Sequence, residues 1–172
     1  DAHIAVNYDM VLQHGLQWYR ERTQAKLAQL DLTDFQQLQR SHFYEAVLIV
    51  LDAVEGFAAR YAKLAGTLAA TEPNAQRRNE LVAMAERLER VPREPARSFA
   101  DAVQSLWLLH VILQIESNGH SLSYGRMDQY LAPFYEKDLD AERITEEEAL
   151  EWLTNLWLKT YSINKIRSWS HT

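Results

Sequence analysis

The longest regular pattern of apolar positions lies over residues 41–70, where hydrophobic side chains recur every three or four residues. This spacing predicts one long amphipathic helix with a single buried stripe. The positions predicted to be buried are Phe43, Val47, Val50, Leu51, Val54, Phe57, Ala58, Tyr61, Leu64, Ala65 and Leu68. A turn containing Pro73 ends this helix, and a second helix is expected over 75–90, antiparallel to the first.

Capping signals mark the start of two further predicted helices. Ser98 stands three residues before Asp101, at the head of an apolar series that predicts a well-buried helix. Thr145 and Glu148 repeat this spacing, so another helix is expected over 146–161.

Two short segments have the composition of strands rather than helices. Residues 2–8 are apolar and rich in residues that favour β structure, and residues 163–169 are similar. A helix is also expected over 9–30. The chain is therefore predicted to be predominantly α-helical with a few short strands, as in a piece of an α/β sheet or barrel.

Composition narrows the classes of protein that remain. The chain has 172 residues, of which 47% are hydrophobic, and no apolar run approaches the ~18 residues that a membrane span needs. The net charge is −6, so we expect neither nucleic acid nor an anionic membrane as a partner. There is no cysteine, which excludes disulfides, thiolate metal sites and a thiol nucleophile in this chain.

The densest polar segment runs over residues 114–130 and follows a very apolar predicted helix. It contains the turn dipeptide Asn118-Gly119. Its polar members are Glu116, Asn118, His120, Ser121, Ser123, Arg126 and Asp128. Two interpretations stay open from composition: a functional loop held by a buried helix, or a solvated turn with local hydrogen bonds.

The six histidines raise the question of a metal site. The candidate ligands are Glu116, His110, His120 and His171. No two histidines have the spacing that places ligands on one helix face, and there is no His-Glu-x-x-His motif. Glu116 and His120 are four residues apart, but the turn dipeptide Asn118-Gly119 lies between them, so no metal site is predicted. His110 lies on an apolar helix face and is expected to be a hydrogen-bonded core residue, whereas His14 and His42 are expected at the surface or at caps.

Three separated motifs carry a family resemblance. They are LQIESNGHSLS at 113–123, GRMDQYLAPFY at 125–135 and INKIRSWSH at 163–171. Together with the opening DAHIAVNY, they resemble the glycyl radical enzymes related to pyruvate formate-lyase. The resemblance is closest to the branch that holds glycerol and diol dehydratases and choline trimethylamine-lyase, and it covers essentially the whole chain.

The resemblance implies a fold and a set of partners. The fold is an α/β barrel of ten strands around an enclosed site, and residues 1–172 would be an internal segment of that barrel domain with no complete domain boundary. A cysteine loop and a C-terminal glycine loop would carry the radical, which an S-adenosylmethionine-dependent iron-sulfur activating enzyme installs. A homodimer in the cytoplasm of an anaerobic cell is also implied. Neither loop is recognisable in this chain, so no catalytic residue and no directly bound cofactor is expected in it.

The resemblance carries a few site residues onto this sequence. His3 and the pair His120 and Ser121 match positions that line the substrate cavity in dehydratase-like members. Their expected role is to hydrogen-bond substrate hydroxyls, and an imidazolium donor would stabilise or protonate a departing hydroxide. Asn118 and Asp1 are weaker candidates for orienting these groups.

Other prominent side chains are expected to be structural. Arg126 and Asp128 are predicted to form an ion pair or helix caps. Trp107, Trp157 and Tyr130 are predicted to pack in the barrel, because aromatic residues at helical spacing most often belong to a core.

The resulting functional expectation is a dehydratase-like glycyl radical lyase that removes water from a small polyol or hydroxylated substrate. This chain would supply part of the substrate-binding wall and would be inactive alone. One alternative is formate C-acetyltransferase activity in the whole protein, although that reaction needs two adjacent cysteines and arginines for a carboxylate. The alternative of another class is a non-catalytic helical scaffold or interaction module.

Overall fold

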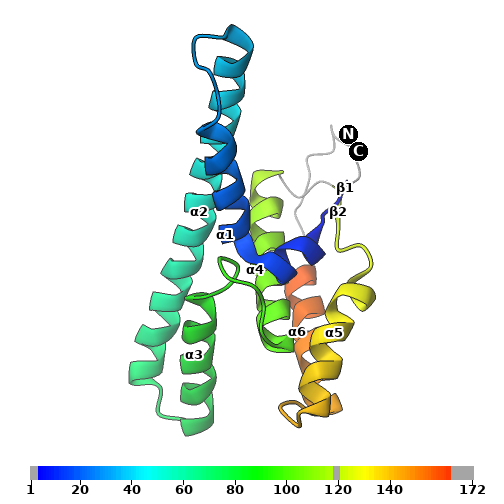
Figure 1. Ribbon diagram of the computed structural model, residues 1–172. Coiled ribbons are helices and arrows are strands. Elements are labelled where there is room, and N and C mark those ends of the chain that lie inside the picture. The colour runs from blue at the N-terminus through cyan, green and yellow to red at the C-terminus, as the bar shows by residue number, and fades with distance from the viewer. Residues whose placement is uncertain (1–3, 118–120, 164–172) are drawn as a thin grey trace, which may run out of the picture. The chain divides into compact units, whose positions relative to one another are not determined.

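The computed structural model describes residues 4–117 and 121–163 of the chain (Figure 1). The described elements are β1 (Ile4–Ala5), α1 (Tyr8–Leu27), α2 (Phe35–Thr71), α3 (Ala75–Leu88), α4 (Phe99–Glu116), β2 (Leu122–Ser123), α5 (Met127–Asp140) and α6 (Glu146–Ser162). The prediction of a predominantly helical chain with a few short strands is confirmed. Among these elements no helix combines the length and the apolar character needed to cross a membrane.

The chain divides into two compact units. The hairpin unit runs from Met10 to Ala96, and the strand unit combines the residues up to Asp9 with those from Arg97 onward. Each unit contains its own packed helices, so each is described by itself.

In the hairpin unit, α2 and α3 form the predicted antiparallel pair and lie side by side in Figure 1. The Asn74 side chain caps α3 by accepting a hydrogen bond from the Arg77 amide at 3.0 Å. Helix α2 begins six residues earlier than predicted, because Asp34 caps it by accepting hydrogen bonds from the Gln36 and Gln37 amides.

The buried face of α2 differs from the predicted stripe. Its buried residues are Ser41, Leu51, Val54, Ala58, Ala62, Ala65 and Ala69. Five of the residues predicted to be buried are at least 47% exposed: Phe43, Val50, Tyr61, Leu64 and Leu68. The prediction was wrong for these positions because α3 is only 14 residues long against the 37 of α2, and the face that α2 buries is a narrow one rich in alanine.

Helix α1 is interrupted at Gly15 and ends at Leu27 rather than at residue 30 as predicted. Gly15 has φ 72°, a left-handed conformation that favours glycine. A Cβ atom built there would lie 2.6 Å from the carbonyl carbon of Glu94. The space is closed because the backbone after α3 pairs with α1: the Leu16 amide donates to the Pro92 carbonyl at 2.9 Å.

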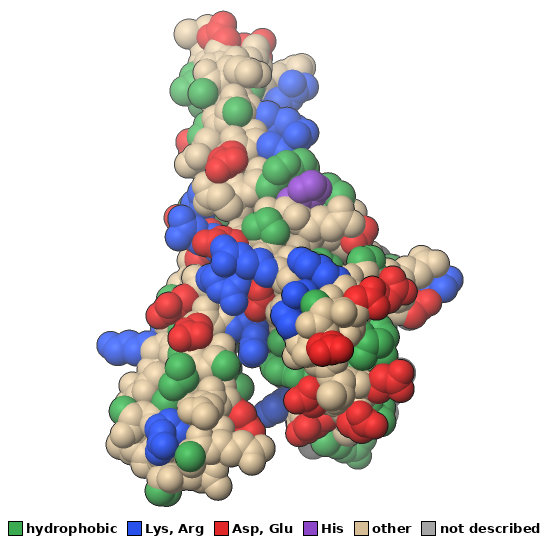
Figure 2. Space-filling view, turned by 60° about the horizontal axis from the view of Figure 1, so that its bottom comes forward, with side chains coloured by type: hydrophobic (Ala, Val, Ile, Leu, Met, Phe, Trp, Pro, Cys, Tyr) green, Lys and Arg blue, Asp and Glu red, His purple; other side chains and the backbone are tan. Residues whose placement is uncertain are grey.

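The strand unit is organised around α4, and both predicted caps are confirmed. Ser98 Oγ accepts from the Asp101 amide at 3.1 Å at the start of α4. Thr145 and Glu148 form a reciprocal capping box at the start of α6. Figure 2 shows acidic side chains gathered where α5 ends and α6 begins, which suits the positive end of the α6 dipole.

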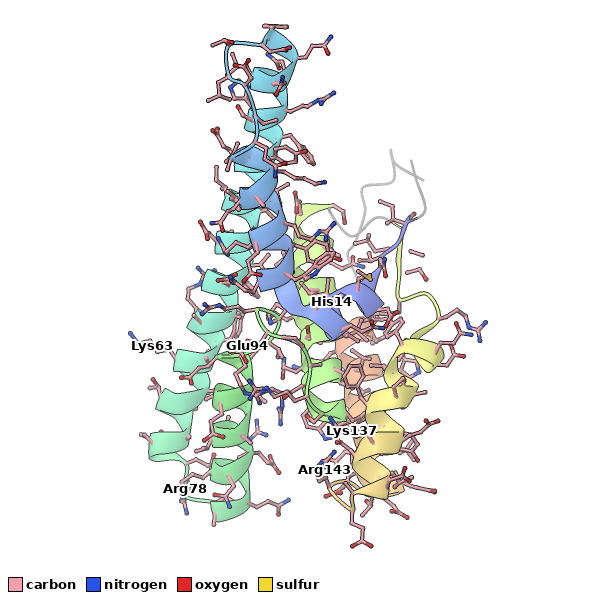
Figure 3. All side chains as sticks on the ribbon, viewed as in Figure 1. His14, Lys63, Arg78, Glu94, Lys137 and Arg143 are labelled. Carbon is pink, nitrogen blue, oxygen red and sulfur yellow. The ribbon has the colours of Figure 1, made fainter. Side chains whose placement is uncertain are left out.

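Helix α5 was not predicted: it contains Pro133 and begins at Met127, inside the polar segment over 114–130 that was interpreted as a loop or turn. A buried carboxylate near its end ties it to α4. Asp138 Oδ2 accepts from the Phe99 amide at 2.7 Å, and Oδ1 accepts from Arg143 Nε at 2.9 Å. Arg143 and Lys137 both lie near the end of α5 in Figure 3. The carboxylate of Asp138 therefore accepts hydrogen bonds both from the first amide of α4 and from Arg143.

The two strands pair in parallel, with Ile4 opposite Leu122 and Ala5 opposite Ser123. The strand predicted over residues 2–8 is shorter in the structure, because Tyr8 already begins α1. In the second predicted strand, over residues 163–169, Ile163 is the C-cap of α6 and the remainder lies outside the described residues.

Candidate functional site

Of the five predicted substrate-binding residues, Ser121 is described by the structure. Asp1, His3, Asn118 and His120 lie outside the described residues. Ser121 is partly exposed and has φ 57°, in the left-handed region that few residues other than glycine adopt. Such a conformation in a serine is a common feature of functional turns, because surrounding contacts must hold it in place.

A backbone hydrogen bond joins the two segments that carry the predicted site. The Ile4 amide donates to the Ser121 carbonyl oxygen at 3.0 Å, at the start of the β1–β2 pair. In the sequence, Ile4 directly follows His3 and Ser121 directly follows His120. Two segments that are distant in sequence are therefore held in a fixed register immediately after both predicted histidines.

The turn after β2 is also ordered locally. Ser123 Oγ accepts from the Gly125 amide at 3.0 Å, and Gly125 has φ 67°. Glycine fits this left-handed position without the cost that a Cβ atom adds. The polar segment thus contains local hydrogen bonds, as the solvated-turn interpretation expects, together with a long-range strand pairing that this interpretation does not require.

Behind the strand pair, His110 of α4 uses both ring nitrogens. Its Nδ1 lies 2.9 Å from the hydroxyl of Tyr8, and its Nε2 lies 3.1 Å from the side-chain nitrogen of Gln114. Since the amide nitrogen donates to Nε2, Nδ1–H donates to the Tyr8 oxygen in a neutral ring. His110 is 2% exposed, which confirms the prediction of a hydrogen-bonded core histidine.

Tyr124, which directly follows β2, stacks on this histidine. The ring centroids of Tyr124 and His110 are 4.1 Å apart, at an interplanar angle of 29°. The Thr160 hydroxyl donates to the Leu156 carbonyl, so the Tyr124 hydroxyl donates to Thr160 Oγ1 at 2.8 Å. Tyr130 in turn donates to the Tyr124 carbonyl oxygen at 2.8 Å. The residue after β2 is therefore fixed through its ring, its hydroxyl and its backbone.

Burial keeps this group of side chains uncharged at neutral pH. Burial lowers the pKa of His110 below its usual value and raises the pKa of the Tyr8, Tyr124 and Tyr130 hydroxyls. A neutral, fully hydrogen-bonded group of this kind is suited to holding neighbouring elements in place. We call Tyr8, His110, Gln114 and Tyr124 the aromatic anchor.

The predicted ion pair after the turn is confirmed. Arg126 contacts both carboxylate oxygens of Asp128, at 3.0 and 2.8 Å, and the hydrogen bond from Arg126 lowers the pKa of Asp128. Both side chains are more than 60% exposed, so water screens the attraction and the pair contributes little to stability.

The other predictions for aromatic and metal-binding residues have mixed outcomes. Tyr130 belongs to the cluster around Tyr124, Trp107 is partly buried, and Trp157 is 62% exposed in this chain, which leaves its predicted packing in a complete barrel untested. Its exposure follows from its place on α6, whose buried residues are Ala149 and Leu156. Of the four candidate metal ligands, His120 and His171 lie outside the described residues, and the described part of the chain holds no cluster of three potential ligands.

Sequence reasoning missed most of the aromatic anchor. Tyr8 was assigned to a strand, and Gln114 and Tyr124 were treated as loop residues. One signal was available: His110 and Gln114 are four residues apart, the spacing of neighbours on one helix face. The partner across the unit, Tyr8, has no signature in the local sequence.

Comparison with known proteins agrees with the resemblance found in the motifs. The family profile described as Pyruvate formate lyase-like matches residues 1–172. The probable dehydratase YbiW of Escherichia coli (strain K12) is 44% identical over 173 residues, which cover 100% of this chain and 21% of that protein. An isethionate sulfite-lyase of Oleidesulfovibrio alaskensis is also 44% identical, over 88% of this chain and 19% of that protein.

A solved structure reports the basis of 1,2-propanediol dehydration in Roseburia inulinivorans. It matches with a TM-score of 0.93 at 42% identity, covering 96% of this chain and 21% of that one. This chain thus spans about a fifth of the length of the relatives that it matches. A match of the family profile over every residue, with close structural agreement, confirms the resemblance to glycyl radical enzymes: the chain belongs to the pyruvate formate lyase-like family.

Proposed function

We propose that this chain forms part of the substrate-binding wall of a glycyl radical dehydratase that removes water from a small polyol or other hydroxylated substrate. One of its relatives is described as a probable dehydratase, and a similar solved structure reports the basis of 1,2-propanediol dehydration. In this proposal residues 1–172 are an internal segment of a ten-stranded α/β barrel domain. The chain has no cysteine, so the residues that remove and return a substrate hydrogen atom belong elsewhere in the enzyme.

One observation carries the proposal for the site. The Ile4 amide bonds to the Ser121 carbonyl, and these residues directly follow His3 and His120. A fixed register between the two segments supports a shared role for the two histidines and Ser121. Preorganised donors are effective because they need not reorganise when charge develops on the leaving group.

The proposed chemistry conserves atoms and electrons. For a 1,2-diol, a hydrogen atom leaves C1, the C1 hydroxyl gives up its proton, the C2–O bond breaks, and the hydrogen atom returns to C2, which gives an aldehyde and water without net oxidation. His3 and His120 hydrogen-bond the substrate hydroxyls, and one imidazolium supplies the proton that turns the departing hydroxide into water. Ser121 Oγ hydrogen-bonds a hydroxyl of the substrate, and Asn118 and Asp1 orient these groups.

The proposal includes the partners that such chemistry requires. A glycyl radical elsewhere in the enzyme is installed by an iron-sulfur activating enzyme that uses S-adenosylmethionine. The enzyme works as a homodimer in the cytoplasm under anaerobic conditions. A site that excludes water and oxygen protects the radical intermediates, so the few polar residues of the wall act in a largely apolar cavity.

The test is made in the complete enzyme after anaerobic activation, with the radical counted by electron paramagnetic resonance. His3→Gln and His120→Gln are each expected to lower turnover of 1,2-propanediol or glycerol by roughly two to four decades, the range for loss of a positioned proton donor. His42→Gln is the matched control, because His42 is an exposed histidine of the hairpin unit.

The same preparation separates the alternatives. Isethionate is included because a sulfite-lyase has the same 44% identity to this chain as the probable dehydratase, over 88% of the chain instead of 100%. Acetyl-CoA formed from pyruvate and coenzyme A would instead support formate C-acetyltransferase activity. Near-normal turnover in both histidine variants, at equal radical content, would refute the roles assigned to them.

A further inference from the structure

The aromatic anchor connects the segments that leave the two strands. Tyr8 lies three residues after the end of β1, and Tyr124 directly follows β2. Both meet His110 of α4, Tyr8 through its hydroxyl at 2.9 Å and Tyr124 by stacking at 4.1 Å between centroids. One histidine side chain therefore contacts the continuation of each strand.

The contacts are directional as well as buried. Tyr8 is 0% exposed and His110 is 2% exposed. Among the described residues, every buried side-chain nitrogen and oxygen has a hydrogen-bond partner. An apolar side chain of similar size would fill the same space, but it would not fix the position of the tyrosine hydroxyl. A hydrogen bond away from water does so, because leaving its donor or acceptor unpaired is costly.

The strand pair is too short to hold its own register. Each strand has two residues, and the pairing is parallel between segments far apart in the sequence. Isolated pairs of short strands are marginal in water, so contacts outside the ladder must supply most of the stability. The aromatic anchor supplies such contacts directly beyond both strands.

We propose that Tyr8 and His110 are positioning residues, which hold β1 against β2 and thereby fix Ser121 in its left-handed conformation beside the substrate. This inference rests on the proposed function, because it takes Ser121 as a residue that faces the substrate. Tyr8 and His110 act through the backbone that they hold and do not touch the reacting atoms.

The sharpest test is Tyr8→Phe in the complete enzyme, since it removes one hydroxyl and keeps the ring. We expect kcat to fall at least tenfold with a smaller change in KM, because misplaced donors lose the geometry of the reaction more than they lose binding. Hydrogen exchange of the peptide containing the Ile4 amide should accelerate at least tenfold, since that amide bonds to Ser121 across the strand pair.

Two further variants separate positioning from general packing. His110→Phe keeps a ring but loses both polar contacts, and it should reproduce the effects of Tyr8→Phe. His110→Asn keeps a donor near the place of Nδ1 and should recover part of kcat and part of the slow exchange. If a variant at His110 fails to fold, Gln114→Met removes the partner of Nε2 and should give a smaller change in the same direction.

Tyr135→Phe is the matched control. Its ring packs on Phe99 in the same unit, so the substitution removes a tyrosine hydroxyl away from the strand pair. It should leave kcat and the exchange of the Ile4 amide unchanged. Radical content, measured by electron paramagnetic resonance, should be equal in all variants.

Normal kcat in Tyr8→Phe and His110→Phe would overturn the inference. If the Ile4 amide then exchanged faster, the anchor would be a structural feature without a positioning role. Failure of the proposed function is seen separately, as normal turnover in the His3 and His120 variants of an otherwise unaltered enzyme.

Discussion

The two units of the chain differ in what they bury. In the strand unit, the buried polar residues include a histidine and two aspartates, all hydrogen-bonded, on α4 and α5. In the hairpin unit, the buried polar residues are Thr23 and Ser41, and the α2 core is mostly alanine. Apolar contacts are non-directional, whereas buried hydrogen bonds specify an orientation. The unit that carries the candidate site therefore specifies its geometry more strictly.

The largest expected effect is at Gly15, where the hairpin unit also constrains its backbone closely. Gly15→Ala would put a Cβ atom against the backbone of Arg93 and Glu94 at a positive φ. We expect a loss of more than ~3 kcal/mol in the free energy of unfolding, from the left-handed conformation and the steric overlap together. Urea denaturation of the chain, followed by circular dichroism, measures it.

Gly56→Ala is the control for that measurement. A Cβ atom at Gly56 would meet nothing within 4 Å, and the residue lies inside α2. Because alanine is the better helix former, stability should rise by about 0.5–1 kcal/mol. A similar loss in both variants would mean that the close approach at Gly15 is not maintained in solution.

The second prediction breaks the strictest polar contact of the strand unit. Asp138→Ala leaves the Phe99 amide and Arg143 without their shared carboxylate. We expect a loss of ~2–3 kcal/mol, in the range for a hydrogen bond to a charged group with one partner left buried. Asp140→Ala is the control, since Asp140 is exposed on the same helix. Equal denaturation midpoints for the two variants would mean that the buried carboxylate of Asp138 contributes no more to stability than the exposed carboxylate of Asp140.

The third prediction concerns the pH dependence of the strand unit. Burial lowers the pKa of His110 in the folded state, so the unfolded chain binds its proton at higher pH. Stability should therefore fall as the pH drops through the usual pKa of histidine, by at most ~1.4 kcal/mol per pH unit. Tyr8 and Tyr124, which contact the ring, stay protonated in this range.

Comparing the chain with its His110→Asn variant isolates that contribution. Urea denaturation between pH 7 and pH 5 should show a steeper loss for the unmodified chain than for the variant. Parallel curves would mean that other groups carry the acid sensitivity.

The smallest expected effect lies on the hairpin unit. Leu64 on α2 is 50% exposed, so Leu64→Gln should change stability by no more than ~0.5 kcal/mol. The adjacent Ala65 is 4% exposed, and Ala65→Leu should cost ~1–3 kcal/mol by overpacking. A reversed order would mean that α2 buries the stripe predicted from the sequence rather than the alanine face.

Sequence alone predicted the features that depend on neighbours along the chain. The caps at Ser98 and Thr145 were correct because a cap is formed within four residues. The prediction of the face that α2 buries was partly wrong, because that face depends on the length and position of α3. Helix α5 was missed because its first residues fall in the polar segment over 114–130, which was interpreted as a loop or turn, and because the contacts of Asp138 that hold the end of the helix are tertiary.

In the candidate site, too, the features formed by neighbours in the sequence were predictable and those formed by distant residues were not. The motifs around residue 120 led to the family, because a motif consists of residues that are neighbours in the sequence and can be recognised without knowing the fold. The contacts that fix Ser121 were not predictable, since the Ile4 amide and the Tyr8 hydroxyl come from the opposite end of the sequence. Only the folded chain brings Tyr8 to His110.

The parallel pairing of β1 with β2 also has a kinetic consequence. It closes a loop of more than a hundred residues, at an entropic cost of about 4 kcal/mol that two residues on each side cannot repay early in folding. We expect the helices to form first and the strand pair to close late, when Tyr8 can reach an α4 that is already packed. Pulse-labelling hydrogen exchange during refolding would then protect the α4 amides before the Ile4 amide.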